Sequence, residues 1–259
     1  MVEKKFIVQA DVNVVWEKEW KGGRPGKKAL RQRLFVEGYP IFRKYFPTSP
    51  QKILDVGGGT GRYGIRLAQD FPGVTVYITD ILPESLDVAR SIAEEVGVTN
   101  VEMRQEDVNA LGFPDDHFDV VFCDVVIQHL PNVTRAMKEM RRVLKRGGLL
   151  MVSVNNFWNP HTLYKLFKGK SYYYGYEKSY TRRELRNLFH THGLAVMAED
   201  GFYPAYSIYR LKTASPIFGV LGKILNRLNR IIDPWTGRFL SRYFGFEIFC
   251  VGKRLDGVN

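Results

Sequence analysis

The stretch KILDVGGGTGRYGIRLA, at residues 52–68, decides the fold of this chain. Residues 52–56 are a short apolar run typical of a buried strand, and residues 62–70 have the spacing of a helix. The glycine-rich turn between them lets bare backbone approach a ligand at the positive end of the helix. We therefore expect a ligand site at this turn.

Strands and helices continue to alternate beyond the turn. Short apolar strands that alternate with helices are joined by right-handed crossovers, so the pattern predicts a parallel sheet covered on both faces. The fold class is therefore a doubly wound α/β domain. The expected strands are 74–79, 101–105, 118–123 and 149–154, and the expected helices between them are 83–96 and 132–145.

The last third of the chain adds a helix and two strands. Thr181 and Glu184 form a Thr-x-x-Glu capping box, which predicts a helix at 182–191. Further strands are expected at 194–199 and 246–251.

Two additions surround this α/β pattern. We interpret residues 1–50 as a helical N-terminal cap on the acceptor side, and residues 51–259 as one domain. The insertion 201–245 interrupts that domain between its last two strands. Such additions are where acceptor-binding elements are expected.

Length and cysteine count limit the class of protein. A chain of 259 residues, 45% of them hydrophobic, buries a core in one or at most two domains. Cys123 and Cys250 are too few for a disulfide framework or a zinc cage, so we expect a cytoplasmic protein without a metal site. No run approaches the roughly 20 apolar residues of a membrane-spanning helix.

The positive charge of the chain is concentrated at its two ends. Residues 1–50 hold 11 basic and 5 acidic side chains, residues 51–155 hold 11 and 15, and residues 156–259 hold 16 and 7. A ligand of the middle segment is therefore expected to be cationic. The basic ends suit an anionic partner, such as nucleic acid, an acidic metabolite or a lipid surface, unless they are simply solvated.

The glycines of the turn can be read in two registers. Gly57, Gly59 and Gly61 give Gly-x-Gly-x-Gly, whereas a register ending at Gly64 gives the Gly-x-Gly-x-x-Gly of dinucleotide binders. Asp55 separates the two, because its carboxylate would repel a pyrophosphate and attract an ammonium or sulfonium group. A dinucleotide is therefore the less favoured ligand.

Two further carboxylates follow the next strands. Asp80 comes about 20 residues after the turn, where it can accept hydrogen bonds from both hydroxyls of a ribose. Asp107 can accept from an adenine amine, while Val108 offers a backbone N–H to a ring nitrogen. In an open parallel sheet these strand ends line one crevice, so we expect the three acids to share a ligand.

At these residues the sequence resembles the class I S-adenosylmethionine-dependent methyltransferases, in particular the small-molecule, ubiquinone-biosynthesis-like type. The resemblance covers about residues 50–200. It is carried by ILDVGGGTGRYGIRLA, VYITDILPESLDVAR, EDVNALGFPDDHFDVVFCDVVIQHLPN, MRRVLKRGGLLMVSV and YTRRELRNLFHTHGL. It implies a Rossmann-like sheet of seven strands with the last one antiparallel.

The same resemblance implies where the cofactor lies. The glycines would contact its methionine and ribose parts with Asp55 at the amino end, Asp80 would hold the ribose, and a backbone carbonyl near Cys123 would take the ammonium. An Asp at 124 is less usual in the family. The full set of cofactor-binding residues is Asp55, Gly57, Gly59, Gly61, Asp80, Ile81, Asp107, Val108 and Cys123.

The implied reaction is methyl transfer from S-adenosyl-L-methionine to a small, acidic or aromatic acceptor, with S-adenosyl-L-homocysteine as product. A sulfonium is a good leaving group, so alignment of the acceptor does most of the chemistry. Asp124 and His129 are the candidate catalytic residues, although His129 also fits a packing role. The alternatives are an RNA or lipid-like acceptor, or an NAD-dependent oxidoreductase.

Acceptor contacts are expected from the additions to the α/β pattern. The oligomeric state does not follow from the sequence. Aromatic and basic side chains there suit a planar or anionic acceptor. Residues 217–232 have apolar side chains at helical spacing opposite Lys223, Arg227 and Arg230. We favour packing of this helix on the domain over rest on a membrane. The acceptor candidates are Arg24, Arg31, Tyr39, Arg43, Trp158, Tyr164 and the run from Tyr172 to Tyr176.

Overall fold

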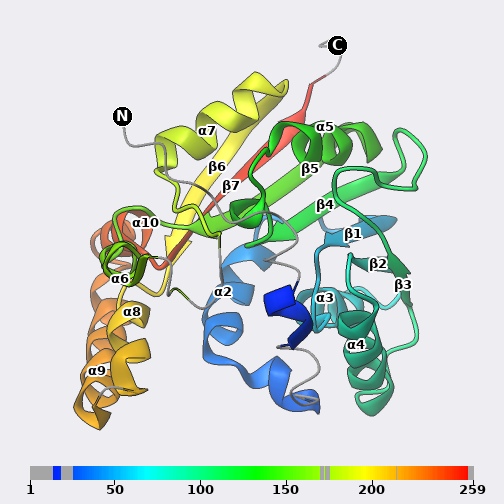
Figure 1. Ribbon diagram of the computed structural model, residues 1–259. Coiled ribbons are helices and arrows are strands. Elements are labelled where there is room, and N and C mark those ends of the chain that lie inside the picture. The colour runs from blue at the N-terminus through cyan, green and yellow to red at the C-terminus, as the bar shows by residue number, and fades with distance from the viewer. Residues whose placement is uncertain (1–13, 19–25, 170–171, 173–175, 214, 256–259) are drawn as a thin grey trace.

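A computed structural model describes residues 14–18, 26–169, 172, 176–213 and 215–255. Its sheet has seven strands in the order β3-β2-β1-β4-β5-β7-β6 (Figure 1). The strands are β1 (Lys52–Val56), β2 (Thr75–Asp80), β3 (Val101–Gln105), β4 (Phe118–Asp124), β5 (Leu144–Asn155), β6 (Leu194–Phe202) and β7 (Glu247–Arg254).

Neighbouring strands from β3 to β5 are parallel, whereas β7 is antiparallel to both β5 and β6. The expected doubly wound, mostly parallel sheet with an antiparallel last strand is therefore confirmed. The helices are α2 (Arg33–Arg43), α3 (Arg62–Asp70), α4 (Pro83–Glu95), α5 (Thr134–Val143), α6 (His161–Lys168), α7 (Arg182–Thr191), α8 (Tyr206–Arg210), α9 (Pro216–Ile232) and α10 (Phe239–Phe244), with short 3₁₀ turns η1 (Gly26–Arg31), η2 (Ile127–His129) and η4 (Leu211–Thr213).

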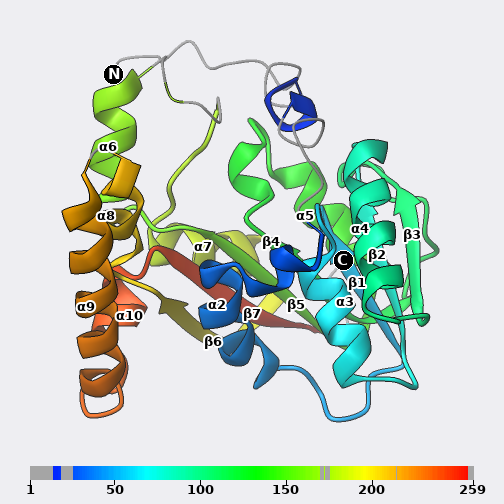
Figure 2. The same cartoon turned by 90° about the horizontal axis from the view of Figure 1, so that it is seen from below.

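Two hydrophobic cores fill the space on either side of the sheet. One face is covered by α2, α3 and α4, and the other by α5 and α7 (Figures 1 and 2). Phe42 of α2 lies against Phe122 and Phe249 of the sheet, with ring centroids 5.1 and 4.7 Å away. Part of the N-terminal segment is thus built into the main core, where burial of aromatic area provides the driving force.

Most element boundaries agree with the sequence pattern. The capping box is present, because the Thr181 side chain accepts from the Glu184 amide and the Glu184 side chain accepts from the Thr181 amide. The expected helix 132–145 is shorter and ends at Val143, because β5 begins already at Leu144. The cap residue of α5 is Val133, and the side chain of the preceding Asn132 accepts from the Thr134 amide at 3.0 Å.

The insertion 201–245 is mostly helical. It begins within β6, which runs to Phe202, and then forms α8, α9 and α10. Figures 1 and 2 both show α6, α8, α9 and α10 gathered at one end of the molecule, beyond the antiparallel strands. No helix of the described residues combines the length and the apolar character needed to cross a membrane.

Candidate active site

A cavity of about 220 Å³ lies at the carboxyl ends of β1, β2 and β4. Chain connections leave β1 and β4 in opposite directions along the sheet, and ligands bind at such a switch point in open α/β sheets. The cavity brings together nine of the eleven residues predicted from the sequence: Asp55, Gly57, Gly59, Asp80, Ile81, Asp107, Val108, Asp124 and His129.

The glycine turn joins β1 to α3 and forms the floor of this cavity. Gly57 and Gly59 have φ of 65° and 56°, a conformation that residues with a Cβ rarely adopt. A Cβ on Gly57 would lie 2.4 Å from the Val126 side chain. Gly64, from the second register, is needed for packing, because a Cβ there would lie 2.5 Å from Ile78. The second register thus has a structural explanation that requires no dinucleotide.

Asp55 and Asp80 hold the turn as well as face the cavity. The Asp55 carboxylate accepts a hydrogen bond from the Gly64 amide at 2.9 Å. The two oxygens of Asp80 accept from the amides of Gly59 and Leu82, each at 3.0 Å. These bonds fix both carboxylates relative to the backbone that a ligand would touch.

The electrostatics of the cavity favour a cation. Burial and the neighbouring Asp124 raise the pKa of Asp55 to about 7. Burial also raises the pKa of Asp80 and of Asp124. A positively charged ligand would stabilise the ionised form of all three carboxyls. These carboxylates therefore fit the sulfonium and ammonium groups of S-adenosylmethionine.

Two ionisable residues, one in the cavity wall and one behind it, were not predicted from the sequence. Arg62 lines the cavity and lies 3.5 Å from the Asp124 carboxylate, while its other nitrogen donates to Gln32 at 2.8 Å. Glu247, at the start of β7, is buried, and its Oε2 has no hydrogen-bond partner. Burial, with Asp124 nearby, raises the pKa of Glu247 well above its usual value, which favours the neutral form of this carboxyl.

The loop after β4 carries backbone strain. Val125 has a φ of 50°, which is an outlier for a β-branched residue. The Ser153 side chain helps to hold the loop, because it donates to Asp124 at 2.5 Å and accepts from the Val125 amide at 3.2 Å. Such strain is concentrated at functional sites. With this backbone conformation, Val125 and Val126 form part of the cavity wall.

The adenine side of the cavity is more open. Asp107 is exposed and its Oδ1 accepts from the Asn109 amide at 2.8 Å, while Val108 is buried. Ile81 is partly exposed beside them. Glu106 also lines the cavity, although its carboxylate accepts from the Gly112 amide at 2.8 Å.

The structure places two of the expected cofactor residues outside the cavity lining. Gly61 is the cap residue of α3, and a Cβ there would lie 2.9 Å from the Ala89 side chain, so this glycine permits α3 to pack against α4. The Cys123 side chain is fully buried in the core beneath α5 and α7. Only its backbone could serve a ligand.

Several acceptor candidates lie away from the cavity. Tyr39 is buried and donates to Asp70 at 2.7 Å, because α2 packs into the core. Arg43 lies over the Phe71 ring and pairs with Asp70, and Arg31 is exposed on η1. Trp158, just before α6, and Tyr164, within α6, are both exposed. Arg24, Tyr173 and Tyr174 lie outside the described residues.

His129 forms part of the opposite wall. Its Nδ1 lies 2.9 Å from the carbonyl oxygen of Tyr176, so Nδ1 carries the proton and Nε2 is the basic nitrogen. Burial lowers the pKa of His129, which keeps the ring neutral at pH 7. Trp16, which the sequence analysis did not single out, lines the cavity with its ring 5.5 Å from that of His129.

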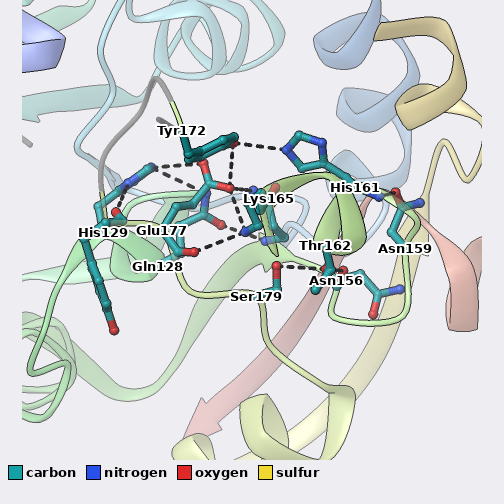
Figure 3. A network of polar contacts seen from close by, with 12 residues as sticks. Gln128, His129, Asn156, Asn159, His161, Thr162, Lys165, Tyr172, Glu177 and Ser179 are labelled. Carbon is teal, nitrogen blue, oxygen red and sulfur yellow. Dashed lines mark hydrogen bonds and ion pairs between the residues drawn. The ribbon is translucent and has the colours of Figure 1, made fainter. Parts of the chain in front are cut away.

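A buried polar network lies behind His129 (Figure 3). Glu177 Oε2 is 4.0 Å from His129 Nε2, and Glu177 Oε1 accepts from Lys165, Asn155 and Tyr172 at 2.8, 2.6 and 3.1 Å. Burial raises the pKa of Glu177, but the groups around it, Lys165 first, lower it by more. Glu177 is therefore an ionised, buried carboxylate beside the candidate base.

The sheet order and its helices are those of the class I S-adenosylmethionine-dependent methyltransferase fold. The sequence profile described as "Methyltransferase domain" matches residues 47–193. The chain therefore belongs to the methyltransferase domain family, and the resemblance noted from its motifs is confirmed.

Two curated relatives show how far the likeness extends. The "Uncharacterized methyltransferase YcgJ" of Bacillus subtilis is 36% identical over 127 residues, which are 47% of this chain and 48% of that protein. The "Demethylmenaquinone methyltransferase" of Deinococcus radiodurans is 36% identical over 106 residues, 40% of this chain and 43% of that protein. The chain spans about half the length of these relatives.

Solved structures extend the likeness of the fold over nearly the whole chain. A geranyl diphosphate C-methyltransferase from Streptomyces coelicolor has a TM-score of 0.67 at 15% identity, covering 95% of this chain and 98% of that one. A possible histamine N-methyltransferase from Thermotoga maritima has a TM-score of 0.63 at 14% identity, covering 93% and 99%. At these identities the likeness establishes the fold alone.

Proposed function

We propose that this protein transfers the methyl group of S-adenosyl-L-methionine to a small acceptor that is acidic or aromatic. The observation that carries this proposal is the trio of carboxyls around a cavity at the switch point of the sheet: Asp55 and Asp124, which are buried, and Asp80, which is partly buried. Carboxyls with raised pKa values in a cleft are typical of functional sites. Here they suit a cationic nucleoside.

Each part of the cofactor has a matching group on the cavity wall. Asp80 would accept from the ribose hydroxyls, and Asp107 with the Val108 amide would recognise the adenine. The Asp55 carboxyl and the bare backbone of Gly57 and Gly59 would face the amino-acid end. The backbone carbonyl of Cys123 remains a prediction for the ammonium.

The bound cofactor would supply an electrophilic methyl on a good leaving group. The residues of the chain would then align the acceptor and exclude water. Trp16 would cover the acceptor, and Arg62 would pair with an acidic group on it. Where the acceptor carries a proton, Nε2 of His129 would take it, with Asp124 as the second candidate base.

A lipid-like, quinone-type acceptor is the second candidate within the same chemistry. It is favoured by the demethylmenaquinone methyltransferase relatives. A planar quinol would still fit the Trp16 wall, because aromatic rings pack on one another at short distance.

Calorimetry with Asp80→Ala tests the cofactor assignment. Loss of the carboxylate removes charge-assisted hydrogen bonds of about 1.5–3 kcal/mol, so S-adenosylhomocysteine affinity should fall roughly ten- to hundredfold. Asp87→Ala, an exposed carboxylate on the following helix, is the control. Equal affinity in both variants, or tight NAD binding by the unmodified protein, would reject the assignment.

The acceptor is identified by incubating cell metabolites and lipids with a labelled methyl donor and determining the mass of the product. His129→Gln and Asp124→Asn are then compared for kcat at saturating cofactor. A drop in kcat without a change in cofactor affinity supports a base, whereas unchanged kcat leaves alignment as the mechanism. Label found only in RNA, with affinity that falls steeply with salt, would favour the RNA alternative.

A further inference from the structure

Helix α9 turns its polar side toward the protein and its apolar side toward solvent. Its buried residues are Gly219, Gly222, Asn226 and Asn229, which share one face of the helix. The opposite face carries large apolar side chains that are 42–69% exposed: Ile217, Val220, Leu221, Ile224, Leu228 and Ile231. Our expectation that the apolar stripe packs on the domain is therefore wrong.

This orientation is fixed by specific contacts on the buried face. Gly222 lets α9 approach α8 closely, because a Cβ there would lie 2.6 Å from the Tyr209 backbone nitrogen. Asn226 donates to Glu37 of α2 at 3.1 Å. Asn229 donates to Ser241 of α10 at 3.1 Å. A turn of the helix about its axis would break these buried bonds, so the exposed stripe is a stable feature.

The apolar surface extends beyond α9. Leu163 and Leu166 of α6 are 70% and 56% exposed, and Phe239 of α10 is 50% exposed. Two tryptophans next to these helices, Trp158 and Trp235, are 60% and 89% exposed. Both ribbon views place α6, α9 and α10 at the same end of the molecule (Figures 1 and 2), which we call the apolar end.

The charge around this surface is strongly positive. Residues 201–245 hold seven Lys and Arg but one acid, Asp233, which is buried. Lys223 and Arg227 are exposed on α9 between the buried face and the apolar stripe. Long basic side chains at the edge of an apolar stripe can reach lipid phosphates while the stripe enters the acyl boundary.

We propose that the apolar end docks onto an anionic lipid bilayer. An exposed apolar face with basic flanks and tryptophans is the composition of a helix that lies in the membrane interface. A second copy of the chain fits less well, because an isologous contact would bring together two surfaces with the same excess of positive charge.

Vesicle co-sedimentation without methyl donor tests the proposal independently of the enzymatic activity. We expect the full chain to bind phosphatidylcholine vesicles containing 30% phosphatidylglycerol, and Ile224→Ser/Leu228→Ser to lower the partition coefficient at least tenfold. Met197→Ser removes an equally exposed apolar side chain from β6, away from the apolar end, and should bind like the unmodified protein. Thermal unfolding confirms that each variant is folded.

A charge variant and an oligomer measurement complete the test. Lys223→Glu/Arg227→Glu should weaken binding to the anionic vesicles and make the remaining binding insensitive to salt. Failure of the unmodified chain to bind the vesicles that contain 30% phosphatidylglycerol overturns the proposal. So does sedimentation equilibrium that shows a dimer dissociated by Ile224→Ser/Leu228→Ser, since the apolar end would then be an interface between copies.

Discussion

At the scale of single residues, Asp55 places function and stability in conflict. The pKa of its carboxyl is raised from 3.8 to about 7, so its contribution to stability is fully present below pH 4 and is lost as the pH rises through about 7. Asp55→Asn keeps an acceptor for the Gly64 amide. It should therefore increase the free energy of unfolding of the ligand-free protein at pH 8, by on the order of 2–4 kcal/mol, and leave it nearly unchanged at pH 4.

Urea unfolding at the two pH values measures this difference, with Asp87→Asn as an exposed control. The same variant should bind S-adenosylhomocysteine more weakly, because a neutral amide cannot balance the ligand ammonium. Loss of stability at pH 8 would contradict the argument and would show that the bond to Gly64 outweighs the cost of burying the charge.

The residues that could be predicted are those whose role follows from position after a strand. Asp55, Asp80 and Asp107 each lie within two residues of the end of a strand, and parallel strands bring those ends together. Glu247 could not be found in this way. It approaches Asp124 only because β7 pairs antiparallel with β5, with Glu247 opposite Asn155. Trp16 reaches His129 from a part of the chain far from any motif.

At the scale of elements, the Lys165–Glu177 ion pair ties α6 to the segment that carries His129's hydrogen-bond partner. Both side chains are buried, with exposures of 9% and 5%. Glu177→Gln would leave the Lys165 charge uncompensated, so we expect a loss of about 3–5 kcal/mol in unfolding free energy. The double variant Lys165→Met/Glu177→Gln should recover part of that loss. Denaturant titration of the three proteins measures this.

The same pair should affect the pH dependence of the reaction. Burial lowers the pKa of His129 and Glu177 raises it, so Glu177→Gln should move the acidic limb of the kcat profile to lower pH. The kcat profile of Glu177→Gln is compared with that of the unmodified protein at a temperature where both are folded. An acidic limb at the same pH in the two proteins would mean that His129 does not act as a base.

Elements were predictable where one local signal dominated. The Thr181–Glu184 capping box, the apolar run of β1 and the short segment of β3 gave correct boundaries. The start of β5 was not predictable, because its pairing with β4 is irregular. Leu144 lies opposite Phe118, and the register shifts before Val120. Nor was the outward face of α9, because the helical spacing of its side chains does not say which face the neighbouring helices α8 and α10 hold.

At the scale of the whole molecule, the sheet order joins the two halves of the cavity. The glycine turn and Asp80 come from β1 and β2, and Asp124 and His129 come from the opposite side of the switch point. Two hydrophobic cores hold these strands in place. A ligand that touches both halves therefore binds the folded protein and not its separate parts, so binding must increase the stability of the whole domain.

Thermal unfolding with S-adenosylhomocysteine makes this argument quantitative. At a concentration 100 times Kd, a ligand that binds only the folded state adds about 2.7 kcal/mol, which for a domain of this size raises Tm by roughly 5–10 °C. The shift should be larger at pH 8 than at pH 6, because ionised Asp55 favours the ligand ammonium. NAD should give no shift, since Asp55 and Asp124 would repel its pyrophosphate. An equal shift with NAD would mean that the carboxylates do not select the ligand.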